Sequence, residues 1–564
     1  MTSNAAAIVI LGPGSLATAR RIQQRYPDAM IHGLAGRVDG ADRQYLEFGA
    51  TLRELYRQDT PIIALCAAGI VIRTLAPLLL EKGVEPPVLA VAEDGSAVVP
   101  LLGGLGGVNV MARDIAQTLQ VAPAITTSGE LRFGTCLLNP PSGYSLGDLE
   151  QGKRFVSDLL AGETVRIEGA APWLDQVQLP EDEQARLAIR IDSAAGTPSV
   201  DELRIYPRNV VVAISAGASP AIGEALREAG LAVQSLACLL AADSDMARPE
   251  LHEAASALNV PLRFAPANGE VDQWLAEALG QPALVQRVDG HAVAVAEQPV
   301  DPQRIGRLRG RLAVIGLGPG AAELMVPAVR AELDRATDVL GYETYVRMAG
   351  PFRADQIQHC TDNREEMQRA RHAFELAAQG RSVVVVSSGD PGVFAMAAAV
   401  LEALHDSTDA RWHAVDLQIL PGVSASLATA AQAGAPLGHD FCVMSLSDNL
   451  KPWSIIEKRL ALAAEADLAL AFYNPISRSR PWQLGRALEI VAQHRTAQTP
   501  VVLGRDIGRP GQTLRVTTLG QLTPDQVDMR TMVLIGSSTT CVFPRAGGGD
   551  WVYTPRWYGH KPAS

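Results

Sequence analysis

Short runs of apolar residues recur along the chain, each followed by a glycine-rich or polar turn and then by apolar residues at helical spacing. The clearest run is Leu-Ala-Val-Ile at 312–315, which leads directly into Gly-Leu-Gly-Pro-Gly at 316–320. Val329, Leu333 and Ala336 then fall on one face of a predicted helix. Mostly branched apolar residues before a sharp break predict a buried strand. This repeated order of strand, turn and helix predicts an α/β protein with several α/β domains.

The same pattern opens the chain, where apolar residues 8–11 precede Gly12, Pro13 and Gly14. No second ligand-type loop supports this turn, so we interpret it as an ordinary connection between a strand and a helix. The further elements predicted in this half are a helix at 17–26, a strand at 60–66, a hairpin at 88–101 around an Asp-Gly turn, helices at 110–119, 147–161 and 245–258, and strands at 209–214, 231–239 and 260–264.

Length and composition narrow the class of protein. A chain of 564 residues is too long for one core, and about three or four domains are expected. Its net charge of -12 argues against nucleic-acid binding by bulk electrostatics. The six cysteines are scattered without a Cys-x-x-Cys pair, so neither a disulfide framework nor a metal site is predicted. No signal sequence or uninterrupted apolar stretch of about 18 residues is seen, which predicts a cytoplasmic protein without a membrane partner.

The C-terminal half carries further strand-then-loop segments. A strand that ends in polar and aromatic residues is predicted at 338–345, and further buried strands lead into polar or small-residue loops at 387–394, 421–425 and 473–475. Ligands bind at the carboxyl edge of α/β sheets, where loops of this kind gather. Taken singly, each loop is also typical of an ordinary turn. A dinucleotide fold is the alternative, but Pro319 and Ala321 interrupt the Gly-x-Gly-x-x-Gly fingerprint.

These segments resemble the tetrapyrrole (class III) S-adenosylmethionine-dependent methyltransferases. The sequence motifs shared by that family occur here at 316–320, 388–391 and 421–424. Finer features are similar to one branch of that family, the precorrin-3B C(17)-methyltransferases. The segments that carry this finer resemblance are 341–345, 387–394, 471–478, 504–509, 536–538 and 552–556. The resemblance implies a two-subdomain methyltransferase domain at 311–556, with subdomains of about 311–430 and 431–556.

The resemblance also implies roles for individual residues. The expected S-adenosylmethionine contacts are Pro319, Ser388, Gly389, Asp390, Val393, Ser424, Ala425 and Asn474. Methyl transfer to C17 is coupled in this family to ring contraction, which needs proton movement, and the acid/base candidates are Glu343, Tyr345 and Tyr473. The substrate is a tetrapyrrole with many carboxylates, which arginine binds bidentately. The arginines considered for this role are Arg478, Arg505 and Arg509, together with Arg480 and Arg515. A homodimer through the methyltransferase domain and hand-over to other corrin-pathway enzymes are expected.

The N-terminal half resembles the hydrolases that open the lactone ring of cobalt-precorrin-5A. The segments that carry this resemblance are 69–73, 94–97, 102–109 and 125–127. It implies hydrolase-like regions at 1–127, 128–207 and 208–298, followed by a linker at 299–310. Leu105 stands where the family commonly has histidine, and the loop at 213–219 lacks the family's cysteine and arginine. Three hypotheses follow: an accessory region without activity, a tetrapyrrole-binding module, or an active hydrolase in a bifunctional enzyme.

Overall fold

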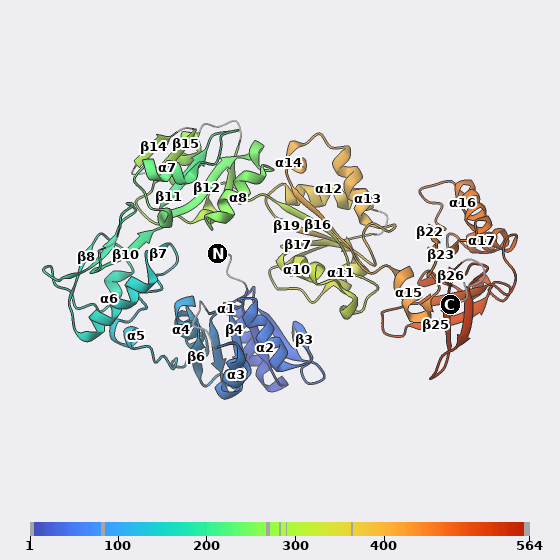
Figure 1. Cartoon of the computed structure of the whole chain (residues 1–564), viewed down its shortest axis with the longest axis horizontal. Coiled ribbons are helices and arrows are strands. Elements are labelled where there is room, and N and C mark those ends of the chain that lie inside the picture. The colour runs from blue at the N-terminus through green and yellow to red at the C-terminus, as the bar shows by residue number, and fades with distance from the viewer. Residues whose placement is uncertain are drawn as a thin grey trace. The chain divides into compact units, whose positions relative to one another are not determined.

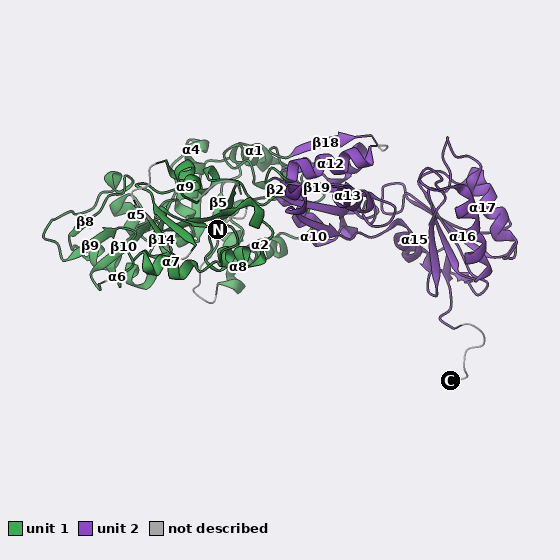
Figure 2. Ribbon diagram, turned by 90° about the horizontal axis from the view of Figure 1, so that it is seen from above, with its two compact units in different colours: residues 1–310, 351–356, 378–380 green, residues 311–350, 357–377, 381–564 purple. Residues whose placement is uncertain are grey.

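The computed structural model describes residues 5–79, 85–197, 199–266, 271–280, 284–288, 290–362 and 365–557. These residues form two compact units, coloured separately in Figure 2. Unit 1 comprises residues 1–310 with 351–356 and 378–380, and unit 2 comprises 311–350, 357–377 and 381–564. Each unit contains several sheets with helices packed on them (Figure 1).

The first sheet of unit 1 has the strand order β3-β2-β1-β4-β5-β6 within the described residues. All neighbours are parallel except β5 and β6, which form the predicted antiparallel hairpin. Its strands are β1 (Ala7–Ile10), β2 (Met30–Leu34), β3 (Arg43–Tyr45), β4 (Ile62–Leu65), β5 (Val88–Val91) and β6 (Val98–Leu102). Its helices are α1 (Leu16–Arg25), α2 (Phe48–Arg57), α3 (Ala68–Leu75) and α4 (Val108–Leu119). The apolar runs of the sequence form this sheet because β1, β4 and β5 are buried along their whole length.

Two smaller sheets complete the described part of unit 1, in the orders β7-β10-β9-β8 and β13-β12-β11-β15-β14. The first contains β7 (Tyr144–Leu146), β8 (Val165–Glu168), β9 (Leu187–Ile191) and β10 (Glu202–Pro207), with α5 (Ser128–Phe133) and α6 (Leu149–Ala161) nearby in the chain. The second contains β11 (Val210–Ile214), β12 (Leu236–Ala242), β13 (Leu262–Ala265), β14 (Leu284–Val288) and β15 (His291–Val295), with α7 (Ile222–Glu228), α8 (Pro249–Ala257) and α9 (Val271–Leu279).

Part of the predicted linker at 299–310 packs onto this last sheet. Arg307 and Phe264 exchange backbone hydrogen bonds of 2.8 and 2.9 Å, and Ile305 is buried in the apolar core. Arg263 also donates to the Ile305 carbonyl at 2.6 Å. The segment therefore adds to the edge beside β13, and the expectation of a plain linker is wrong for these residues.

Unit 2 begins with a parallel sheet of order β18-β17-β19-β16-β20. Its strands are β16 (Arg311–Gly316), β17 (Asp338–Tyr342), β18 (Ile357–Thr361), β19 (Ser382–Ser387) and β20 (Asp416–Leu420). Its helices are α10 (Pro327–Arg335), α11 (Glu343–Ala349), α12 (Glu366–Ala377), α13 (Met396–His405) and α14 (Ala410–His413). The predicted strand through Tyr345 is shorter in the structure, because β17 ends at Tyr342 and α11 begins at Glu343.

The second part of unit 2 contains a mixed sheet of order β22-β23-β26-β24-β25 and a small sheet of order β21-β28-β27. The mixed sheet contains β22 (Phe441–Ser445), β23 (Ala469–Tyr473), β24 (Pro500–Arg505), β25 (Thr513–Thr518) and β26 (Thr531–Ile535). The small sheet contains β21 (Gly434–Ala435), β27 (Cys541–Pro544) and β28 (Asp550–Tyr553). The helices are α15 (Ala425–Ala433), α16 (Trp453–Glu465) and α17 (Gln483–Ala492).

Helix α15 packs on the mixed sheet of unit 2. Ala430 and Ala433 share one apolar core with Ala471 and Val502. The chain therefore changes sheet between residues 420 and 425, and the subdomain border at about 430 stays a prediction.

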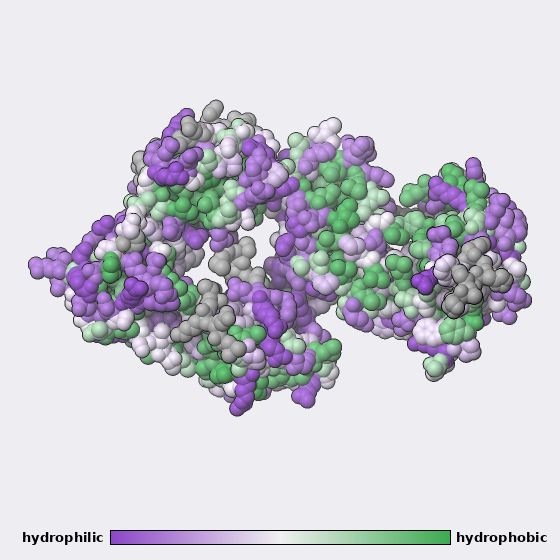
Figure 3. Space-filling model, viewed as in Figure 1, coloured by the Kyte–Doolittle hydropathy of each residue, from purple (hydrophilic) through white to green (hydrophobic). Residues whose placement is uncertain are grey.

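The surface and helix lengths bear on membrane association. Polar and hydrophobic residues are interspersed over the visible face in Figure 3. Among the described helices, none combines the length and the apolar character needed to span a bilayer.

Candidate functional site

The loops after β16, β19 and β20 meet at the carboxyl edge of the first sheet of unit 2. The parallel register places Gly316 beside Ser387, and the backbone amide of Leu317 donates to the Ser387 carbonyl at 2.8 Å. Gly318 and Gly389 then exchange two backbone hydrogen bonds of 2.8 and 3.1 Å. The two loops are thus held together by main-chain groups, which leaves little room for side chains.

Glycine is required at this junction by space and by backbone conformation. A Cβ atom on Gly316 would lie 2.3 Å from the Gly389 carbonyl oxygen, and one on Gly422 would lie 2.1 Å from the same atom. Gly318 and Gly389 adopt φ values of 73° and 68°. A Cβ on Gly389 would come within 3.7 Å of the Ser424 Cα atom. The close packing of the three loops therefore depends on these glycines.

Asp390 joins the second and third loops. Its carboxylate accepts hydrogen bonds from the amide of Gly392 at 2.8 Å and from that of Gly422 at 3.1 Å. In the same loop the amide of Val393 donates to the Asp390 carbonyl at 3.2 Å. A carboxylate has about four acceptor positions, so Asp390 retains capacity for a ligand hydroxyl.

The beginning of α15 forms another wall of the site. Ser424 is buried and its hydroxyl caps the helix by accepting from the Leu427 amide at 3.4 Å. The amide of Ser426, one residue beyond Ala425, donates to the Tyr473 hydroxyl at 3.1 Å. Tyr473, at the end of β23, is therefore placed at the start of α15.

Aromatic and cationic groups lie beside Tyr473. The ring of Phe394 is 5.4 Å from that of Tyr473, and 53% of Phe394 is exposed. The Lys451 ammonium lies 5.9 Å from the Phe394 ring centre, and burial lowers the pKa of Lys451. Asn474 follows Tyr473 with a φ of 49° and donates to the Ser445 hydroxyl at 3.1 Å.

Arg509 reaches back to the loops of the first sheet. Its guanidinium donates to the Pro319 carbonyl at 3.0 Å and to the Ser388 hydroxyl at 3.3 Å. Gly320 accommodates this side chain, since a Cβ there would lie 2.7 Å from the Arg509 Cγ. Burial raises the pKa of Tyr345, and the charge of Arg509 acts in the opposite direction. Arg509 thus connects two predicted cofactor contacts, a role that the sequence does not indicate for it.

The other residues assigned from the sequence lie in different surroundings. Glu343 is exposed at the start of α11 and pairs with Arg347 one helical turn later. Arg505 pairs with Asp528 at 2.8 Å, which engages the guanidinium. Arg478 and Arg515 are exposed, whereas Arg480 is buried.

The predicted cofactor residues therefore gather in unit 2, and the structure adds neighbours that the sequence does not indicate. Pro319, Ser388, Gly389, Asp390, Ser424 and Ala425 line the meeting loops, Val393 continues one of them, and Asn474 adjoins Tyr473. Ser426, Ser445 and Lys451 escape sequence reasoning because serine and lysine in loops carry no distinctive spacing. The roles of the site residues remain predictions.

A cavity lies in unit 1, beside the glycine-rich segment after β6. It measures about 290 Å³, and its walls include Leu105, Asn109, Thr127 and Glu130. The Asn109 amide donates to the Glu130 carboxylate at 2.5 Å and to the Thr127 hydroxyl at 3.1 Å. Arg113 pairs with the other Glu130 oxygen. Both oxygens of the buried carboxylate are thus engaged, and Leu105 contributes no proton-transferring group.

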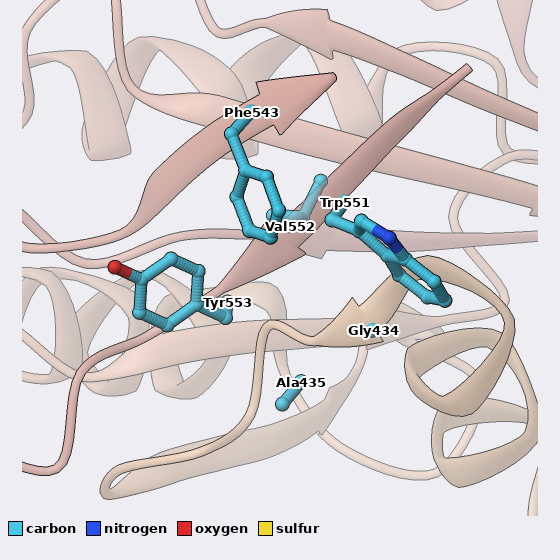
Figure 4. Close-up of a pocket in the computed structure, with 6 residues that line it drawn as sticks. All are labelled: Gly434, Ala435, Phe543, Trp551, Val552 and Tyr553. Carbon is cyan, nitrogen blue, oxygen red and sulfur yellow. The ribbon is translucent and has the colours of Figure 1, made fainter. Parts of the chain in front are cut away.

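Another cavity, of about 430 Å³, is lined mainly by apolar groups and lies in unit 2. Phe543, Trp551 and Tyr553 of the β27–β28 hairpin line it beside Gly434 and Ala435 (Figure 4). Arg545 stacks 4.2 Å from the Trp551 ring centre. Within the described residues, no group of three or more histidine, cysteine or acidic side chains is arranged to hold a metal.

Two families match the chain. Residues 311–523 match the family of Tetrapyrrole (Corrin/Porphyrin) Methylases, and residues 50–130 match the Cobalamin synthesis G N-terminal family.

Individual relatives match the C-terminal part. The precorrin-3B C(17)-methyltransferase of Sinorhizobium sp is 51% identical over 251 residues, which are 44% of this chain and 98% of that protein. The cobalamin biosynthesis protein CobIJ of Mycobacterium bovis is 46% identical over 260 residues, and the match spans 45% of this chain and half of that relative. A crystal structure of the methyltransferase CobJ is 51% identical, with a TM-score of 0.41, and the match covers 44% of this chain and all of the other.

Proposed function

The chain belongs to the tetrapyrrole methylase family, and on that premise we propose that its C-terminal domain methylates precorrin-3B at C17 with ring contraction to precorrin-4, in cobalamin biosynthesis. The observation that carries the proposal is the 51% identity over nearly the full length of a relative named for this reaction. The glycine-lined loops of unit 2 support it, because they offer the backbone surface that such a methyl donor requires.

The methyl donor is S-adenosylmethionine, which supplies a methyl group activated by sulfonium charge. We assign its binding to Pro319, Ser388, Gly389, Asp390, Val393, Ser424, Ala425 and Asn474. Gly316 and Gly422 let the loops approach one another, and Arg509 keeps the first two loops in register. The protein mainly has to align the donor with the substrate carbon, so rigid loops are the principal catalytic contribution.

The proton movements of ring contraction are assigned to side chains near these loops. Burial raises the pKa of Tyr345 above its ordinary value, so its phenol stays protonated and can donate a hydrogen bond to the substrate. Tyr473 is held by the Ser426 amide, with its hydroxyl directed to the start of α15. Glu343 is exposed and paired, which makes it the weakest of the three candidates.

The direct test is incubation of the full chain with S-adenosylmethionine and precorrin-3B, with mass spectrometry and carbon-13 spectroscopy of the product. The proposal predicts one added methyl group at C17 and a contracted ring. If the chain methylates only the cobalt-containing compound, that compound and not precorrin-3B is its substrate. Methylation at another carbon would refute the assignment.

For the N-terminal half we propose an accessory, tetrapyrrole-binding role without hydrolase activity. The support is chemical: Leu105 has no proton to transfer, and both oxygens of Glu130 in the same cavity are already engaged. The loop at 213–219 directs its Gly217 amide to Asp245 at 2.7 Å and carries neither cysteine nor arginine.

Acetaldehyde release from the lactone intermediate separates this role from the hydrolase alternative. The full chain is expected to release none while its N-terminal half still binds tetrapyrrole. Release at a catalytic rate would establish a bifunctional enzyme.

Size determination in solution would test the expected homodimer, and product transfer to a second corrin-pathway enzyme would test hand-over.

A further inference from the structure

Arg480 is a buried arginine, and two of its guanidinium nitrogens make no hydrogen bond within the described part of the chain. It lies in the segment between β23 and α17, six residues after Asn474, and only 9% of it is exposed. Ser477 and Arg480 exchange backbone hydrogen bonds of 3.0 and 3.1 Å, which fix a tight turn. The Nε and Nη1 atoms of its guanidinium are buried, and neither makes a hydrogen bond among the described residues. A tight turn thus carries a side chain in which two donor atoms lack an acceptor.

Another buried arginine in the same unit has an acidic partner. Arg495 pairs with Asp467 at 3.0 Å and also donates to the Leu468 carbonyl at 3.1 Å. Burying a charge without a partner is unfavourable. A partner supplied from outside the chain would offset that cost at Arg480.

The residues that follow Arg480 in the chain include an exposed aromatic side chain and a glutamine that binds an acidic one. The next residues include Trp482, which is half exposed and packs edge-on against Trp453 at 4.9 Å. Gln483 donates to Asp448 at 3.3 Å, so this acidic neighbour already has a hydrogen-bond donor. The Asn474 amide ties the same segment to Ser445. An exposed indole and an unsatisfied guanidinium therefore lie on the segment that also carries a predicted cofactor contact.

We propose that Arg480 binds a peripheral carboxylate of the tetrapyrrole and so positions the macrocycle against the methyl donor. The inference rests on the proposed function, whose substrate is a flat ring system with several carboxylates. The guanidinium presents its donors in a planar fork that matches a carboxylate, which lysine does not reproduce. Arg480 is thus a positioning residue that sets affinity and orientation.

Arg480→Met and Arg480→Lys in the full chain test this role, with Arg486→Met as the matched control. Arg486 is an exposed arginine of α17 that pairs with Glu457 at 2.8 Å. We expect Arg480→Met to raise KM for precorrin-3B by about 10- to 100-fold and to leave KM for S-adenosylmethionine unchanged. Its Tm should stay equal or rise, because an unpaired buried charge is removed. A fall in Tm with an equal rise in both KM values would indicate a structural role and overturn the inference.

A binding experiment keeps the inference separate from the proposed reaction. Uroporphyrin III, which carries eight carboxylates, and its methyl ester serve as probes, with fluorescence quenching as the signal. The wild-type chain should prefer the free acid, and Arg480→Met should lose about 10-fold or more of that preference, whereas Arg486→Met should not. Equal preference in the wild type and Arg480→Met would overturn the role of Arg480. If the chain prefers the free acid as expected but does not methylate precorrin-3B, the proposed reaction would be overturned and the role of Arg480 would stand.

Discussion

The chain contains two nearly identical strand-glycine-proline-glycine turns, and their surroundings differ. After β1, a Cβ atom added to Gly12 or Gly14 would meet no heavy atom within 4 Å, and neither glycine adopts a positive φ. After β16, the glycines at 316, 318 and 320 are crowded by other loops or take left-handed conformations.

The comparison teaches that a glycine motif acquires meaning from what packs against it. In unit 1 the turn passes through η1 (Pro13–Ser15) directly into α1. In unit 2 the turn contacts the loop after β19 through Gly389 and the segment after β24 through Arg509. Only the second turn is surrounded by the parts that a ligand site requires.

The largest expected effect comes from filling the crowded junction. In Gly422→Ala the new methyl group would lie 2.1 Å from the Gly389 carbonyl oxygen and 2.6 Å from that of Gly316. We expect a loss of about 3 kcal/mol in the free energy of unfolding, by analogy with overpacked cores, and loss of S-adenosylmethionine binding. Denaturant unfolding and calorimetric titration measure the two effects. Binding within about threefold of wild type would show that the loops need no such closeness.

The second largest effect is expected from acid, which should destabilise the first sheet of unit 1 more than the first sheet of unit 2. His32 in β2, beside β1, has its pKa lowered to about 4 by burial, with the Arg43 charge adding to the effect and Asp42 opposing it. The unfolded chain therefore binds a proton below about pH 6.5 that the folded sheet does not accept, so stability is complete above that pH and falls toward pH 4. At pH 5 the expected loss is about 2 kcal/mol.

Hydrogen exchange of β1 and β2 amides at pH 7 and pH 5, corrected for intrinsic rates, measures this loss, with β16 and β19 as internal reference. His32→Leu should abolish the difference between the two pH values. An equal change in both sheets, or a difference that survives in His32→Leu, would assign the effect to other groups.

Removing the hydrogen bonds by which Arg509 joins the loops after β16 and β19 should have an intermediate effect. Arg509→Met loses the hydrogen bonds to the Pro319 carbonyl and the Ser388 hydroxyl. We expect the Kd for S-adenosylmethionine to rise about tenfold, which corresponds to about 1.4 kcal/mol. Arg515→Met, at an exposed position in β25, controls for the lost charge in this cofactor-binding measurement. Equal Kd values for the two variants would show that cofactor binding does not depend on the hydrogen bonds of Arg509.

The smallest effect is expected in the first turn. Gly14→Ala has open space for its methyl group, and restricting the unfolded chain should change the free energy of unfolding by less than about 1 kcal/mol, in the stabilising direction. Thermal unfolding and the same calorimetric titration check this. Loss of cofactor binding in Gly14→Ala would mean that the first turn also serves a ligand.

The strands and the order of the loops could be predicted from the sequence because buried strands are continuous apolar runs. The motif at 387–394 places Gly389 and Asp390 correctly after β19, and their main-chain partners follow from the sheet. The end of β17 at Tyr342 could not be predicted, since a polar residue after a strand does not say whether a helix begins at once.

The long-range contacts of the site could not be predicted in this way. Arg509 lies 190 residues from Pro319 in the sequence, and no local sequence pattern predicts the hydrogen bond between them. The positive φ of Phe394, which lies beside Tyr473 and Lys451, is equally invisible in a residue that rarely adopts it. The unsatisfied guanidinium of Arg480 emerges only when its neighbours are in place.

Calorimetric titration of the full chain with S-adenosylmethionine tests the central claim most directly, namely that the loops packed around the second glycine turn form a cofactor site and the first turn does not. The account predicts one binding event per chain, lost in Gly422→Ala and preserved in Gly14→Ala. Binding that survives Gly422→Ala, or that disappears in Gly14→Ala, would contradict it.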